Sequence, residues 1–153
     1  MTIRIGNEVL TEHIRVKIRL DYRGEGRSSR FIFGNRRGEE IVEQIREQEV
    51  ALLRNVPMQG LFLEDIDLSI DPYTVNESDG RRKREVTYAP VVITLRFENI
   101  DDLLPLVTKP EFRKIEFLSP ENLNIHRLDI ERLFFRVSKI LQEEIKKTEL
   151  RFE

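Results

Sequence analysis

The chain has 153 residues, of which 35% are charged, with a net charge of −2 and no cysteine. Disulfides and thiolate metal sites are therefore excluded, and the nearly balanced charge argues against a surface dominated by one sign. No apolar run reaches the roughly 20 residues that span a bilayer, so we expect a single cytoplasmic domain over residues 1–153 with no membrane partner. The many charges, together with the absence of Cys and Trp, also suggest a thermophilic source.

Alternating apolar and polar residues predict a strand over residues 14–22, with one buried face and one hydrated face. Before it, residues 3–10 predict a small hairpin with Gly6 and Asn7 at the turn. After it, a loop rich in Gly and Arg leads to residues 30–33, which are expected to return as a short strand.

A helix is expected at residues 38–54, because Glu39 suits the positive end of the helix dipole and apolar residues follow at the helical period. Strands are expected at residues 61–70 and 87–98. The polar segment 71–86 between them is predicted to be a long hairpin loop.

A short helix after Asn99, a strand at residues 112–118 and a long helix at residues 127–148 complete the pattern. The repeated order of strand, helix and strand predicts an α+β fold: a ferredoxin-like split βαβ sheet (βαββαβ) with a long C-terminal helix and an extra N-terminal hairpin. An antiparallel sheet made of consecutive hairpins is the alternative. Because Pro90 lacks an N–H group, it is expected near the start of its strand or at an edge.

Asp65 and Asp67 point to the same side of their predicted strand, and two aligned carboxylates can hold Mg²⁺. The first strand, however, presents Arg15, Lys17 and Arg19 on its hydrated face. A ladder of opposite charges across the sheet therefore explains the two acids better than a metal does.

The two histidines, His13 and His126, lack the spacing of a metal site. Glu49 falls within the apolar stripe of helix 38–54, where a buried acid would be a functional candidate. We expect instead that the apolar stripe wanders around the helix, or that Glu49 lies at its edge and pairs with an arginine. No catalytic residue, metal or cofactor is predicted.

Two Arg-rich loops, residues 23–38 and 81–84, are candidates for a phosphate-contacting surface. The residues concerned are Arg27, Arg30, Arg36, Arg37, Arg81, Arg82 and Arg84. Acidic residues interrupt both runs, so ordinary hydrated loops explain them as well. The nucleic-acid hypothesis requires the two loops to converge in space.

The last helix carries a broad apolar face that is expected to pack on the sheet: Ile130, Leu133, Phe134, Val137, Ile140, Leu141 and Ile145. Leu128 and Phe135 fall almost opposite this face, at about 100° per residue, and are predicted to contact a partner unless the N-terminal hairpin covers them. We therefore expect a non-catalytic binding or assembly module that forms a homo-oligomer or docks a protein partner. The alternative is a nucleic-acid or nucleotide-binding domain that uses loops 23–38 and 81–84.

Overall fold

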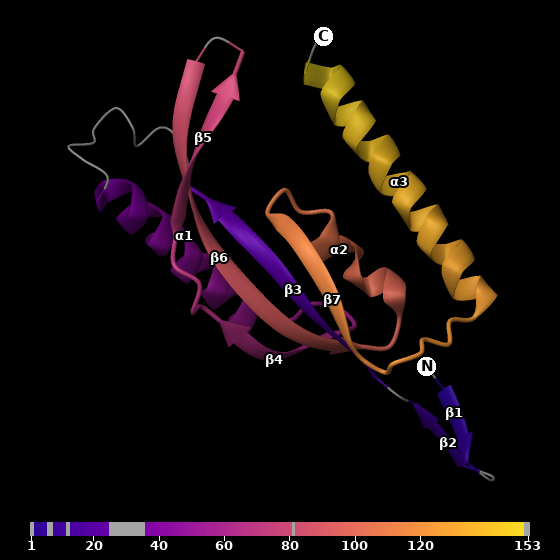
Figure 1. The fold of residues 1–153 in the computed structure, drawn as a ribbon. Coiled ribbons are helices and arrows are strands. Elements are labelled where there is room, and N and C mark those ends of the chain that lie inside the picture. Colours follow the sequence, from indigo (N-terminus) through magenta and orange to yellow (C-terminus); the bar gives the residue numbers. More distant parts are fainter. Residues whose placement is uncertain (1, 6–7, 12, 25–35, 81, 152–153) are drawn as a thin grey trace.

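The computed structural model describes residues 2–5, 8–11, 13–24, 36–80 and 82–151 (Figure 1). In chain order the elements are β1 (Thr2–Ile5), β2 (Glu8–Thr11), β3 (Ile14–Arg23), α1 (Arg36–Asn55), β4 (Leu61–Asp67), β5 (Tyr73–Asp79), β6 (Arg82–Phe97), the 3-10 helix η2 (Ile100–Leu103), α2 (Leu104–Val107), β7 (Phe112–Ser119) and α3 (Arg127–Arg151). The fold is α+β, as predicted.

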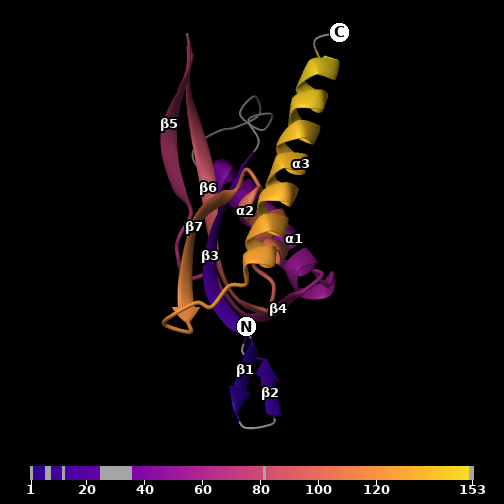
Figure 2. The same ribbon diagram turned by 90° about the vertical axis from the view of Figure 1, so that its right-hand side faces the viewer.

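Five of the strands form one antiparallel sheet with the order β4-β6-β3-β7, in which β5 also pairs with β6. Strand β3 lies between β6 and β7, both of which come much later in the chain. The alternative of a sheet made of consecutive hairpins is therefore wrong. Helices α1 and α2 lie on the same side of the sheet (Figure 2).

The core lies between this side of the sheet and its helices. Val16, Ile18 and Leu20 of β3 are fully buried, whereas the alternating residues Arg15 and Lys17 are exposed. Apolar residues of β6, α1 and η2 complete the same layer. Each large apolar side chain buried there contributes about 1.5–3 kcal/mol, so the alternation of β3 determines which face of the sheet the helices cover.

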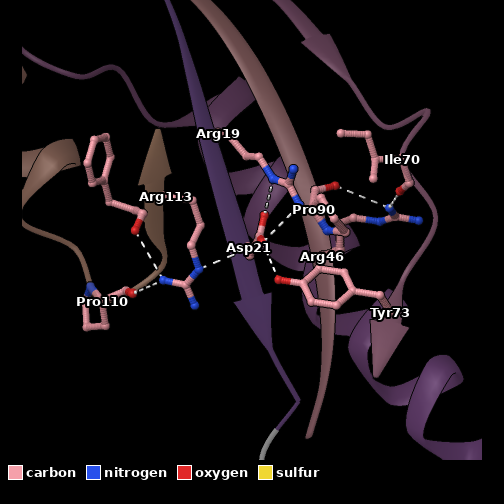
Figure 3. A network of polar contacts seen from close by, with 9 residues as sticks. Arg19, Asp21, Arg46, Ile70, Tyr73, Pro90, Pro110 and Arg113 are labelled. Atoms are coloured by element: carbon pink, nitrogen blue, oxygen red, sulfur yellow. Dashed lines mark hydrogen bonds and ion pairs between the residues drawn. The ribbon is translucent and has the colours of Figure 1, made fainter. Parts of the chain in front are cut away.

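Strand β6 is longer than predicted and pairs with two shorter strands along one edge. β4 pairs with residues 92–97 of β6 and β5 pairs with residues 82–88. Pro90 falls in the gap between them, in mid-strand but at a locally free edge, where no neighbour needs its missing N–H group. Arg46 of α1 reaches this gap and donates to the carbonyl oxygens of Ile70, at 3.2 Å, and Pro90, at 3.4 Å (Figure 3).

The prediction of a loop over residues 71–86 is wrong, because most of this segment forms the paired strands β5 and β6. Cross-strand pairs explain why a polar segment is extended here. The rings of Tyr73 and Tyr88 stack with their centroids 5.5 Å apart, and the hydroxyl groups of Thr74 and Thr87 are hydrogen-bonded at 3.0 Å. Such pairs stabilise a sheet by a few tenths to about 1 kcal/mol each.

The expectation that α3 packs on the sheet is also wrong. Its principal contact is with η2, and in Figures 1 and 2 α2 lies between the sheet and α3. Two arginines of α3, Arg132 and Arg136, bind Asp101 of η2. They lie about 140° around the helix from the centre of the apolar face, so the anchored side of α3 is not its most apolar side.

The strands of the predicted N-terminal hairpin are present, since β1 pairs with β2 in an antiparallel two-stranded sheet. The predicted turn at Gly6 and Asn7 and the predicted strand at 30–33 lie outside the described residues. None of the helices in the described ranges combines the length and apolarity needed to cross a membrane.

Candidate functional site

Helix α3 is 25 residues long, and none of the residues from Arg127 to Arg151 is buried. Four of its apolar residues form an exposed stripe, with between 41% and 68% of each residue accessible: Ile130, Phe134, Leu141 and Ile145. Spacings of four and seven residues align them along one side of the helix. Contiguous apolar surface of this kind in water marks interaction sites, so the exposed stripe is the leading candidate for a functional surface.

The other half of the apolar face is turned towards the rest of the chain. Leu133, Val137 and Ile140 are only partly exposed, unlike the neighbouring residues of the exposed stripe. The sequence pattern does not distinguish these two halves, because all seven residues share one apolar face. The arginines that bind Asp101 set the rotation of the helix and thereby decide which half faces water.

These contacts hold α3 through a buried carboxylate. Asp101 of η2 is 4% exposed and accepts hydrogen bonds from Arg136, at 2.7 Å, and from Arg132, at 3.1 and 3.2 Å. Burial alone would raise the pKa of Asp101, but the hydrogen bonds from Arg136 and Arg132 outweigh it and lower the pKa below its usual value. We call Asp101, Arg132 and Arg136 the Asp101 anchor.

Gly60 supports the anchor from the turn before β4. Its φ angle is +76°, in the left-handed region that favours glycine. A Cβ atom at this position would lie 2.2 Å from Oδ2 of Asp102, the residue beside Asp101. Since Asp102 is 3.7 Å from Arg136, the missing side chain of Gly60 leaves room for the carboxylates that hold α3.

Leu128 and Phe135, the predicted partner contacts, are both well exposed on α3. The ammonium group of Lys139 lies over the ring of Phe135, 5.0 Å from its centroid. Because the exposed stripe is just as accessible, these two residues are not distinguished by exposure, and their role in partner binding stays a prediction.

The Arg-rich loops can be compared only in part. Arg27, Arg30 and Arg81 lie outside the described residues, and the structure describes the backbone but not the side chains of Arg36 and Arg37. Arg82 and Arg84 lie on β6, where Arg84 is opposite Glu77 in the strand register. Convergence of the two loops, and nucleic-acid or nucleotide binding by them, stays a prediction.

The open face of the sheet carries the predicted acids, Asp65 and Asp67, and both are exposed. The predicted ladder of opposite charges is present in part, since Arg15 pairs with Glu64 and the charge of Lys17 acts on Asp67. A register irregularity after Leu63 accompanies the pairing of Arg15 with Glu64, at 2.8 Å, rather than with either aspartate. Hydrogen bonds from Ser69 are the main cause that lowers the pKa of Asp67, and the charge of Lys17 adds to them.

No three His, Asp or Glu side chains among the described residues are placed to share a metal ion. His13 lies 3.9 Å from Glu98, and its ring meets that of Phe62 edge-on. His126 precedes α3, where its Nδ1 atom accepts a hydrogen bond from the backbone N–H of Leu128 at 3.2 Å. Both histidines therefore have local structural contacts.

Sequence reasoning missed a polar cluster around Asp21. Although Asp21 lies on the open face of β3, it is only 2% exposed. Arg19 and Tyr73 donate hydrogen bonds to its carboxylate, and Arg113 approaches to 3.8 Å (Figure 3). Arg113 and Tyr73 come from segments far along the chain, so the only local signal is Arg19, two residues away on the same strand face.

No known protein family, curated protein or solved structure matches this chain. Its function is therefore inferred from its own surfaces. In the described part of the chain, seven of the fifteen exposed large hydrophobic residues belong to α3.

Proposed function

We propose that this chain is a non-catalytic assembly module that self-associates through the exposed stripe of α3. The observation that carries the proposal is the combination of a fixed helix and a free apolar side. The Asp101 anchor holds the helix to η2 at one place, while Phe134, Leu141 and Ile145 remain more than half exposed.

We further infer that the sheet that carries α3 has a ferredoxin-like topology. The support is the chain order of strand, helix and strand, repeated once, with the strand order β4-β6-β3-β7 and antiparallel pairing throughout. In this interpretation β5 is an added strand that pairs with the other end of β6 from β4. The short helices η2 and α2 take the place of the second helix of the ferredoxin-like order. Because η2 and α2 are short, α3 is the outermost helix on that side of the sheet.

A second copy of the chain is the partner that the exposed stripe fits best. From Ile130 to Ile145 the stripe is about 22 Å long, and its four side chains each offer roughly 100 Å² of apolar surface. Two such helices would bury about 800 Å², below the roughly 1,200 Å² at which specific interfaces begin, so this surface alone supports a weak, transient association. Two copies of one apolar surface are self-complementary, as a twofold interface requires.

The experiment is sedimentation velocity with light scattering on the full chain over a wide concentration range. The double variant Phe134→Glu/Leu141→Glu loses about 1.5–3 kcal/mol for each large apolar side chain removed from the interface. We therefore expect association to weaken by at least about a hundredfold. The control Gln142→Glu adds one of these two negative charges on another side of α3 and removes no apolar side chain.

The variant Phe135→Glu tests the predicted contact of Leu128 and Phe135 separately. Because these residues lie across the helix from the exposed stripe, two paired helices cannot cover both surfaces at once. A loss of large oligomers but not of dimers in this variant would show that both sides are used. An unmodified chain that remains monomeric at every concentration would contradict self-association.

A further inference from the structure

A cavity of about 690 Å³ opens beside the end of β3 that β7 does not reach. Its lining includes Ile41, Ile45 and Glu49 of α1, and Pro110 and Glu111 of the turn before β7. The volume lies within the roughly 300–1,000 Å³ of small-molecule sites. This cavity is distinct from α3, none of whose residues lines it.

Tyr22 is the buried polar group of this cavity. It is 3% exposed, lines the cavity, and its hydroxyl group has no hydrogen-bond partner. Burial raises the pKa of Tyr22 well above its usual value, and the negative charges of Glu49 and Glu111 raise it further. A buried hydroxyl group without a partner is destabilising, and a ligand that bonds to it would offset this cost.

Two acids of the cavity, Glu49 and Glu111, have no ion-pair partner among the described residues, whereas its third acid, Asp21, and its two arginines are paired. Neither Glu49 nor Glu111 forms an ion pair with another described side chain. The expected pairing of Glu49 with an arginine stays a prediction, because the side chains of Arg27, Arg30, Arg36 and Arg37 lie outside the described residues. Arg23 binds Glu77 at 3.1 Å, and Arg113 binds Asp21 and the carbonyl oxygens of Pro110 and Phe112. Among the described residues, the uncompensated charge of the cavity is therefore negative.

We propose that this cavity binds a small aliphatic amine. Glu49 and Glu111 supply the charge that attracts an ammonium group, the Tyr22 hydroxyl supplies a hydrogen-bond acceptor, and Ile41 and Ile45 contact the alkyl chain. An anion would be repelled by the two carboxylates. A bare metal ion would leave the isoleucine side chains unused and would find only two acidic ligands that are not bound by described arginines, since Asp21 is held by Arg19 and Arg113.

The test is isothermal titration calorimetry of the full chain with cadaverine, a five-carbon diamine, at physiological ionic strength. The neutral counterpart is 1,5-pentanediol, which has the same chain length. We expect cadaverine to bind with a stoichiometry of one per chain and the diol to give no heat of binding. Equal behaviour of the two compounds, or no binding of cadaverine, would overturn the proposal.

Variants separate this site from nonspecific attraction to acids. Glu49→Gln/Glu111→Gln is expected to weaken cadaverine binding at least tenfold, while Glu47→Gln, on an exposed position of the same helix, leaves it unchanged. If Glu47→Gln weakens binding as much as the cavity variant does, the amine binds diffusely and the proposal fails.

Tyr22→Phe removes the unpaired hydroxyl group without a change of shape. We expect this variant to be at least as stable as the unmodified chain and to bind cadaverine several-fold more weakly. Amide shifts of Tyr22, Glu49 and Glu111 in NMR spectra of the unmodified chain give a second readout that needs no substitution. Cadaverine binding with no shift at these three residues would overturn the assignment. Because oligomeric state is measured on the same samples, failure here is distinguishable from failure of α3-mediated assembly.

Discussion

Gly60 is the residue at which one added methyl group would disturb the attachment of α3. Gly60→Ala places a side chain at φ +76° and forces a Cβ atom against the Asp102 carboxylate. The left-handed backbone costs about 1–2 kcal/mol, and displacement of Asp102 adds to it. Gly80→Ala is the matched control, because its φ is +60° but nothing lies within 4 Å of the new Cβ. We expect Gly60→Ala to lower the free energy of unfolding by about 1 kcal/mol more than Gly80→Ala in urea titrations; equal losses would contradict this role of Asp102.

Asp101 makes the attachment of α3 sensitive to acid. Its folded-state pKa is lowered, so its contribution to stability is present above the unfolded pKa of about 3.9 and is lost as the pH falls through the lower folded value. Asp101→Asn is expected to cost about 1–3 kcal/mol at neutral pH, and this difference from the unmodified chain should shrink below about pH 4. Urea unfolding at several pH values checks it, with exposed Asp71→Asn as the control. A difference that stays constant with pH would show that the charge of Asp101 is not what holds α3.

At the scale of elements, the sequence predicts the strands and helices whose formation depends on residues close together in the chain. β3 follows from strict alternation, and α1 follows from its apolar stripe, because burial on one face is enough to define each. β5 is missed because its stabilising partners, such as Tyr88 for Tyr73, lie on another strand. The full length of β6 is missed because Pro90 suggests an edge, and only the gap between β4 and β5 explains how it fits in mid-strand.

The exposed stripe of α3 is predictable only in part, because its exposure depends on residues far away in the chain. The apolar face of α3 is visible in the sequence, but its exposure depends on Asp101, which precedes Arg132 by 31 residues. The cavity beside Tyr22 likewise depends on where β7 begins relative to β3. A sequence shows that Tyr22 is on the buried side of its strand, but not that its hydroxyl group lacks a partner there.

At the scale of the whole molecule, the sheet and its core are built without α3, since none of its residues belongs to the core cluster. A chain that ends at His126 is therefore expected to keep its sheet and α1 and to unfold cooperatively. It should lose the self-association proposed for the full chain. Circular dichroism during urea unfolding, combined with light scattering, checks both outcomes. A truncated chain without cooperative unfolding would show that α3 stabilises the core directly.

The position of the Asp101 anchor along α3 has a mechanical consequence. Both arginines lie in the first half of the helix, and from Arg136 to Arg151 it continues for about 22 Å. Over such a lever, a tilt of about 10° at the anchor displaces the far end by about 4 Å. Two copies joined along α3 would therefore inherit their relative orientation from a few hydrogen bonds to one carboxylate, and small changes around Asp101 would be amplified into large changes in the geometry of the pair.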